Sequence, residues 1–266
     1  MQNWMKRLAG HYRNMRDAFP EDDLIVVLDV DDTILDLCHM VAKVLTSFDD
    51  FHGTVYFRHV TRGDLAAGET GVYGILKGLG IPRRDGQRIG EWYGKNSWSS
   101  SVVREAHRPF PGIMELIAWL QRQPRTFVGL NTGRPETIRG ETLECLNLLG
   151  RRHGAVFNDS LLFMNPGGWN QNIPESKVAG MEHFSKRGYR VVAFFDNEPE
   201  NLRVIADYAG PKEVLLLHAD TVFTSERAIL PQGAVSGRTY DTSRLIQAAG
   251  RSCPPGQAAS ALPCKN

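Results

Sequence analysis

Five apolar runs stand out in the pattern of this chain and predict its strands. The first run, residues 24–28, is rich in β-branched side chains and is followed at once by a cluster of acidic residues. A short continuous apolar run of this kind is typical of a strand that is covered on both faces of a parallel sheet. The other predicted strands span residues 126–130, 156–164 (interrupted by Asn158, Asp159 and Ser160), 190–195 and 214–217.

Apolar residues at helical spacing lie between these runs and predict helices. Pro135 and Pro199 stand where a first helical turn is expected, a position that suits proline because an N–H there has no intrahelical partner. The predicted helical stripes span residues 113–120, 138–149, 178–184 and 202–209. Because strands that alternate with helices favour right-handed crossovers, the predicted fold class is α/β, a Rossmann-like three-layer sandwich with a parallel sheet.

Residues 51–107 break this alternation and predict an insertion. The segment is rich in glycine and aromatic residues, and it separates the first two strands by far more than one crossover helix needs. We interpret it as a mostly helical cap inserted after the first strand. The catalytic core then comprises residues 24–50 and 108–250, and we expect residues 251–266 to form a disordered tail.

The N-terminal residues 1–23 predict an amphipathic helix. Trp4, Leu8 and Tyr12 recur at helical spacing, with Lys6 and Arg7 between them. Two interpretations are open: the helix packs on the core and leaves its basic face in water, or it binds a partner.

Composition and charge narrow the class of protein. The hydrophobic fraction is 42% and the net charge is +1, so long-range attraction of the whole chain to nucleic acid or to an anionic membrane is not expected. No apolar run reaches the roughly 18 residues of a membrane helix, so no membrane partner is predicted. The four cysteines are far apart, which fits a reducing compartment, and we expect a cytoplasmic location. Cys145 lies on an apolar stripe and is predicted to pack in the core.

The acidic cluster after the first strand reads Asp29-Val30-Asp31-Asp32-Thr33. In extended backbone, side chains two residues apart point the same way, so Asp29 and Asp31 converge at the carboxyl end of the strand. Ligands bind at that end of open α/β sheets. Two neighbouring carboxylates repel each other, and a divalent cation would relieve the repulsion. Oxygen ligands of this kind suit Mg²⁺.

This cluster and its strand, "LIVVLDVDDT", resemble the first motif of the haloacid dehalogenase-like superfamily, specifically its phosphohydrolase branch. The motif is an apolar strand followed by D-x-D-x-T, and the resemblance spans about residues 24–218 with a cap between the first and second motifs. It implies a magnesium-dependent phosphohydrolase that cleaves a phosphate monoester. Asp29 would attack phosphorus and form an aspartyl-phosphate. Asp31 would protonate the leaving group and then deprotonate water, and it argues against carbon–halogen cleavage.

The second and third family motifs supply groups that would bind the substrate phosphate. "FVGLNTGR" contains Thr132, whose hydroxyl can donate to a phosphoryl oxygen, followed by Gly133 and Arg134. "PESKVAG" contains Lys177, which would stabilise the transferring phosphoryl group, with Ser176 as the expected N-cap of its helix. Lys186, a rival for the same role, is expected to face solvent.

The fourth motif supplies the remaining metal ligands. "VVAFFDNEPENL" gives Asp196 as a ligand, but Asn197 stands where many family members have a second acid. The second acidic contact is left open between Glu198 and Glu200, both of which also suit the first turn of a helix. The predicted metal ligands are Asp29, Asp31, Asp196 and Glu200.

We expect the cap to determine substrate specificity. Its cations Arg83, Arg84, Arg88 and Lys95 could contact an anionic substrate, and its aromatic residues could stack on a base or sugar; alternatively, the cations face water and the aromatics form a small core. These aromatics are Trp92, Tyr93 and Trp98.

Three functions remain open at this stage. The leading one is hydrolysis of a small phosphorylated metabolite or nucleotide. A phosphatase for nucleic-acid ends would need a basic groove that joins the N-terminal helix to the cap. A phosphate-binding or regulatory module without turnover is supported by Asn197. The sequence names neither the substrate nor the oligomeric state.

Overall fold

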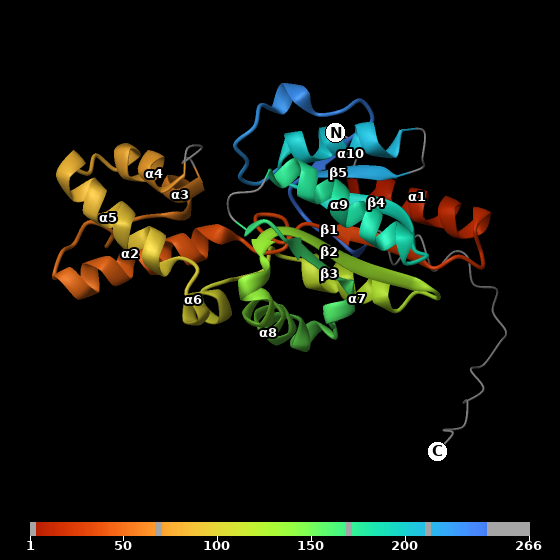
Figure 1. Cartoon of the computed structure of the whole chain (residues 1–266), viewed down its shortest axis with the longest axis horizontal. Coiled ribbons are helices and arrows are strands. Elements are labelled where there is room, and N and C mark those ends of the chain that lie inside the picture. Colours follow the sequence, from red (N-terminus) through yellow and green to blue (C-terminus); the bar gives the residue numbers. More distant parts are fainter. Residues whose placement is uncertain (1–3, 67–70, 169–171, 211–213, 244–266) are drawn as a thin grey trace, which may run out of the picture.

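The computed structural model describes residues 4–66, 71–168, 172–210 and 214–243. Six parallel strands form one sheet in the order β3-β2-β1-β4-β5-β6, which confirms the predicted α/β class (Figure 1). The strands are β1 Leu24–Leu28, β2 Thr126–Pro135, β3 Leu162–Asn165, β4 Arg190–Asp196, β5 Leu215–Ala219 and β6 Val235–Gly237. The predicted tail, residues 251–266 with Cys253 and Cys264, lies outside the described residues.

Helices cover both faces of the sheet, as the continuous apolar strands predict. In β1, Val26 joins one core cluster and its neighbours Ile25 and Val27 join the other, because successive side chains point to opposite faces. The first face is covered by α1 Trp4–Ala18, α7 Ile113–Gln121 and α8 Arg139–Gly150. The second face is covered by α9 Ile173–Lys186 and α10 Pro199–Ala209.

Helix α1 packs on the core, which settles the two interpretations of the N-terminal helix. Its side chains Trp4, Leu8 and Tyr12 are buried in the same cluster as the sheet. Hydrogen bonds also anchor this helix: for example, Trp4 Nε1 donates to the carbonyl of Thr239 at 2.7 Å, and the Tyr12 hydroxyl lies 2.8 Å from Thr126 Oγ1.

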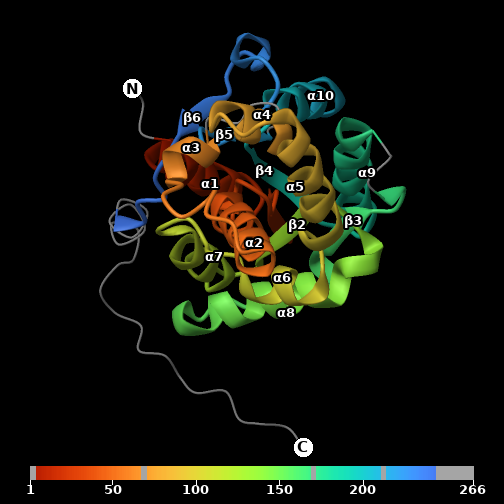
Figure 2. The same ribbon diagram turned by 90° about the vertical axis from the view of Figure 1, so that its left-hand side faces the viewer.

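The inserted segment forms a helical cap, as predicted, and stands over the carboxyl ends of the strands (Figures 1 and 2). Its helices are α2 Leu37–His52, α3 Arg62–Ala66, α4 Val72–Gly78, α5 Arg83–Asn96 and α6 Ser100–Glu105. The expected boundary at residue 51 falls inside α2, whose residues Leu45 and Phe48 pack in the core of the cap with Ile89. The cap therefore begins with α2.

The two connections between core and cap run side by side. The Asp36 N–H donates to the Arg108 carbonyl at 2.8 Å, and the Phe110 N–H donates to the Ile34 carbonyl at 2.9 Å. Asp36 also caps α2, because its side chain accepts from the Cys38 N–H. The hinge of the cap is thus a paired, hydrogen-bonded element.

Other predictions meet mixed outcomes. The run at 156–164 contributes only the end of its length to β3, because Asn158 accepts from the Ser160 N–H and starts a 3₁₀ turn instead. Cys145 is buried, as predicted.

Within the described residues, no helix combines the length and apolar character that crossing a bilayer requires. Short 3₁₀ helices occupy Glu136–Ile138, Arg151–His153, Asp159–Leu161 and Arg227–Ile229.

Candidate active site

Two acids and one lysine meet at the carboxyl end of the sheet. Asp29 directly follows β1, Asp196 ends the neighbouring strand β4, and Lys177 comes from α9. The Lys177 ammonium donates to Asp29 Oδ1 and lies 3.0 Å from Asp196 Oδ2. It also donates to the Asn131 carbonyl at 2.7 Å. All three charged side chains are buried, so the structure brings these predicted residues together.

Burial controls the protonation of this group. It raises the pKa of Asp29 to about 7, against the lowering effect of the Lys177 ammonium and with a further rise from Asp196. Burial would lower the pKa of Lys177, but the carboxylates of Asp196 and Asp29 outweigh it and raise that pKa above its ordinary value. Lys177 is therefore protonated and forms ion pairs with both carboxylates.

Buried polar atoms beside this lysine have few partners. Among the described residues, Asn131 Oδ1 and Ser176 Oγ are buried without a hydrogen-bond partner, and Asp196 Oδ2 has only its ion pair with Lys177. Asn131 and Asp196 contact Lys177 directly, and Ser176 precedes it in α9. Native proteins rarely leave buried polar atoms unpaired, and a cluster of them indicates a place for water, an ion or a ligand.

Arg134, predicted to bind phosphate, is engaged elsewhere. Its Nε and Nη2 atoms donate to the two oxygens of Asp31 at 2.8 and 2.6 Å, and its other donors are directed at Thr142 and His107. The side chain of Arg134 is fully buried. Four of the five guanidinium N–H groups are thus directed at protein acceptors, which disfavours phosphate binding by Arg134. That role stays a prediction.

Asp31 consequently occupies a different environment from Asp29. Burial alone would raise the pKa of Asp31, but the charge and hydrogen bonds of Arg134 reverse this and hold the pKa below its ordinary value. The structure thus stabilises the carboxylate form of Asp31. That form suits the deprotonation of water, one half of the role expected for Asp31, and disfavours the proton-donating half.

Thr132 and Gly133 lie between these two groups in β2. The Thr132 oxygen accepts from the Arg134 N–H at 3.2 Å, so its hydroxyl proton is still available to an acceptor. A Cβ atom at Gly133 would lie 3.3 Å from Ile173 Cδ1, at the start of α9. Glycine here lets α9 approach the strand and deliver Lys177.

The turn after β1 is held from several sides. Asp32 has a left-handed backbone with φ of 53°, and its carboxylate accepts from the Leu37 N–H at 3.2 Å. Burial raises the pKa of Asp32 to about 8. The hydroxyls of Thr221 and Tyr240 donate to the carbonyls of Asp32 and Thr33. These contacts fix the direction in which the acidic cluster points.

The acids that follow Asp196 serve the fold. Asp196 Oδ1 accepts from the Glu198 N–H at 2.9 Å and from Asn201 Nδ2 at 3.0 Å. Glu198 accepts hydrogen bonds from Thr224 and Ser225, and so clamps the segment after β5.

Asn197 and Glu200 also differ from the metal-site interpretation. Asn197 Nδ2 donates to the Val222 carbonyl, so this residue clamps the same segment as Glu198. Glu200 is half exposed and lies 3.8 Å from Arg203, an environment that gives no support to a metal-binding role, so that role stays a prediction. No group of three His, Cys, Asp or Glu side chains able to hold a metal ion is found in the described part of the chain.

Asn131 is a site residue that the sequence analysis did not single out. Its side-chain Nδ2 donates to the Lys177 carbonyl at 2.8 Å, so strand β2 grips both ends of that lysine. A Cβ atom at Gly180 would lie 2.4 Å from Asn131 Nδ2, which makes glycine necessary one turn further along α9. The available signal was an amide residue beside Thr132 at the end of a buried strand.

The expected helix start near Lys177 needs a correction. Ser176 was expected as the N-cap, but α9 begins at Ile173 with Asn172 before it, so Ser176 lies inside the helix and is buried. Lys186 is exposed and pairs with Glu182, as its position late in the helix predicts.

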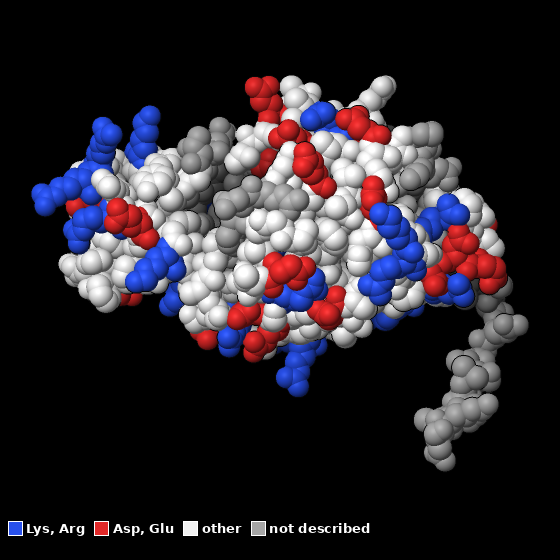
Figure 3. Space-filling view, viewed as in Figure 1, with Lys and Arg blue, Asp and Glu red and all other residues white. Residues whose placement is uncertain are grey.

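The four cations predicted in the cap are exposed to solvent. Arg83, Arg84, Arg88 and Lys95 are all exposed, and Lys and Arg side chains gather at the outer end of the cap (Figure 3). Trp92 donates to Ser47 Oγ at 3.1 Å and packs in the cap, so the aromatic residues form a small core.

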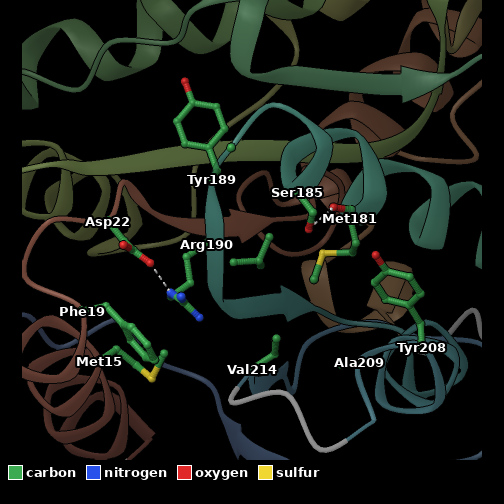
Figure 4. Close-up of a pocket in the computed structure, with 12 residues that line it drawn as sticks. Met15, Phe19, Asp22, Met181, Ser185, Tyr189, Arg190, Tyr208, Ala209 and Val214 are labelled. Carbon is green, nitrogen blue, oxygen red and sulfur yellow. Dashed lines mark hydrogen bonds and ion pairs between the residues drawn. The ribbon is translucent and has the colours of Figure 1, made fainter.

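A second hollow lies at the opposite end of the sheet (Figure 4). It has a volume of about 530 Å³ and is lined mainly by apolar side chains such as Phe19, Met181 and Val214. Arg190, the first residue of β4, pairs with Asp22 at 2.7 Å on its wall. Because Asp196 is the last residue of β4, this hollow is separate from the acids described above.

Comparison with known proteins supports the fold. No protein-family model matches the sequence, and no curated protein matches it either. A HAD-superfamily hydrolase (subfamily IA, variant 1) from Geobacter sulfurreducens superposes with a TM-score of 0.52 at 14% identity, over 82% of this chain and 93% of that one. A candidate phosphatase from Clostridium difficile superposes with a TM-score of 0.54 at 12% identity, over 85% and 99%. The chain thus has the fold of the haloacid dehalogenase-like hydrolases.

Proposed function

We propose that this protein is a phosphohydrolase, a magnesium-dependent phosphatase that cleaves small phosphate monoesters through an aspartyl-phosphate on Asp29. The observation that carries the proposal is the buried group of Asp29, Lys177 and Asp196, in which one lysine joins two acids at the carboxyl end of the sheet. Phosphoryl transfer needs a nucleophile that attacks phosphorus, and a cation with hydrogen-bond donors that stabilises charge on the phosphoryl oxygens.

The residues divide the reaction between them. The Asp29 carboxylate forms a bond to phosphorus as the bond to the leaving oxygen breaks. Lys177 and the Thr132 hydroxyl donate to the phosphoryl oxygens, where negative charge must be stabilised. Water then attacks the phosphorus, the Asp29–phosphorus bond breaks, and the Asp31 carboxylate accepts the water proton. Substrates whose leaving groups need no proton suit this arrangement best, because Arg134 holds Asp31 in its carboxylate form.

Charge balance favours a divalent cation in this site. Three carboxylates (Asp29, Asp31 and Asp196) meet two cations (Lys177 and Arg134), which leaves one negative charge before a phosphate dianion is added. The carboxylate oxygens of Asp29 and Asp196 are the hard donors that Mg²⁺ prefers, and Lys177 takes only one acceptor direction of Asp196 Oδ2. These two residues would hold Mg²⁺, which would neutralise charge on the phosphate.

The alternatives have less support. Asn197 was the best argument for a module without turnover. In the structure, its side chain donates a hydrogen bond to the segment after β5, so it has a structural role there. A nucleic-acid phosphatase would need a basic groove between α1 and the cap. Helix α1 lies in the core lobe, away from the cap (Figure 1). A small phosphorylated substrate is therefore the better proposal.

The test is hydrolysis of 4-nitrophenyl phosphate by purified protein with and without Mg²⁺. We expect Asp29→Asn to lower kcat by at least about 10³-fold, because an amide is a far weaker nucleophile of nearly the same shape. The control is Asp207→Asn, which removes an exposed acid paired with Arg203 and should leave the rate unchanged. Hydrolysis that persists in Asp29→Asn and in the presence of a chelator would refute the proposal.

A further inference from the structure

The contacts of Arg134 join three parts of the molecule. Besides its two bonds to Asp31, it donates through Nη1 to Thr142 Oγ1 of α8 at 3.2 Å. Its Nη2 lies 3.0 Å from His107 Nε2, in the second connection to the cap. The indole ring of Trp98, in the turn between α5 and α6, covers the guanidinium at 5.1 Å. One buried side chain therefore links an acid of the site to the core and to the cap.

His107 acts as an acceptor in this arrangement. Its Nδ1 lies 3.0 Å from the Val103 carbonyl, which can only accept, so Nδ1 carries the proton and Nε2 accepts from Arg134. Burial lowers the pKa of His107 to about 4, which keeps the ring neutral beside the guanidinium. The orientation of Arg134 thus depends on where the cap connection places His107.

Asp31 is held from its buried side only. The side chain of Asp31 is 23% exposed, whereas that of Arg134 is 0% exposed. A carboxylate offers about four acceptor directions, and Arg134 takes one on each oxygen. The directions that remain are available to a water molecule on the accessible side.

The geometry points to Arg134 as a positioning residue that holds the Asp31 carboxylate ready for water and makes its placement depend on Trp98 and His107 of the cap. The inference rests on the proposed function. The step concerned is the second one: water oxygen bonds to phosphorus, the Asp29–phosphorus bond breaks, and Asp31 takes the proton. A cap that moved would carry Trp98 and His107 away from Arg134 and so loosen Asp31.

The two steps can be separated with 4-nitrophenyl phosphate, whose leaving group needs no proton. Rapid mixing with Mg²⁺ resolves a first burst of nitrophenolate, which reports attack by Asp29, from steady turnover, which reports attack by water. We expect Arg134→Lys, which keeps the charge but loses the two-point grip, to retain the burst and to slow turnover by about 10- to 100-fold. Trp98→Leu should slow turnover by a smaller factor. The matched control is Tyr73→Leu, an exposed aromatic residue of the cap that lies outside the cluster around Trp98 and should leave both phases unchanged.

A double-mutant comparison completes the test. In an Asp31→Asn background, Arg134→Lys should change turnover by less than about twofold, because the group that it positions is gone. Equal loss of burst and turnover in Arg134→Lys, or full additivity with Asp31→Asn, would show a purely structural role and overturn the inference. If Arg134→Lys does not fold, Trp98→Leu and His107→Gln are judged by the same criteria. Absence of any hydrolysis in the unaltered protein would instead refute the proposed function, and the inference with it.

Discussion

Two buried cations stand beside the first acidic cluster, and their surroundings differ. Lys177 is shared between two carboxylates, Asp29 and Asp196, which stand at the ends of adjacent strands. Arg134 is forked on a single carboxylate, Asp31, and is covered by the Trp98 ring. A cation shared by two acids can turn one of its N–H groups to a phosphate, whereas a cation forked on one acid and covered by a ring indicates a support. The comparison teaches that burial of a charge alone does not identify the reacting group.

Replacing Lys177 should give the largest effect. Lys177→Met leaves two buried carboxylates without their cation, so we expect kcat to fall by about 10²- to 10³-fold. The free energy of unfolding should also fall, by about 3–5 kcal/mol, because one partner of a buried ion pair is removed. Steady-state kinetics and urea unfolding measure the two. An unchanged kcat would show that Lys177 takes no part in the reaction, and the distinction drawn between Lys177 and Arg134 would fail.

Arg134 should behave as a structural pair with Asp31. Arg134→Met alone should destabilise the fold by about 3–5 kcal/mol, because Asp31 is left without its partner. The double variant Asp31→Leu/Arg134→Met removes both charges and should recover most of that loss. Urea unfolding of the two variants decides the point. A double variant as unstable as the single one would mean that Arg134 stabilises the fold through Thr142 and His107 instead.

The protonation of Asp32 should make the stability of the fold depend on pH. Burial raises its pKa from 3.8 to about 8, so the folded chain keeps a proton that the unfolded chain has already lost. Stability from this group is therefore lost as pH rises from about 4 to 8, at up to about 1.4 kcal/mol per pH unit. Asp32→Asn, which tolerates the same left-handed backbone, should flatten this dependence. Urea unfolding at pH 5, 6.5 and 8 measures it. Parallel curves for the two proteins would contradict the raised pKa.

Glu200 should have the smallest effect. Because it is half exposed beside Arg203, Glu200→Gln should change the Mg²⁺ concentration for half-maximal activity by less than about twofold. Titration of activity with Mg²⁺ is the measurement. A shift of tenfold or more would restore Glu200 as a metal ligand and show that the loop rearranges when the ion binds.

The sequence predicted the placement of residues that depend on strand ends. Asp29 and Asp196 each end a continuous apolar strand, and adjacent parallel strands bring such ends together. Lys177 followed from the family resemblance. The structure places Asp29 and Asp196 side by side because their positions depend on periodicity and on the order of the strands, whereas the position of Lys177 rested on the motif alone.

The direction of side chains beyond the strand ends could not be predicted. Arg134 turns toward Asp31 where the register between β2 and β3 shifts after Asn131, and sequence shows no such shift. Glu198 is committed to Thr224 and Ser225, which lie more than twenty residues further along the chain. Strand β6 is only three residues long, too short for an alternation to be recognised.

Gly180 carries a lesson for anyone who would stabilise this protein by engineering. A glycine inside a helix is an obvious candidate for exchange to alanine, which normally gains about 0.5–1 kcal/mol. Here the added methyl group would lie 2.4 Å from the Asn131 amide nitrogen, so either that amide would lose its bond to the Lys177 carbonyl or α9 would have to shift. A design based on helix propensity alone would therefore select a substitution that disturbs the position of Lys177 while aiming to raise stability.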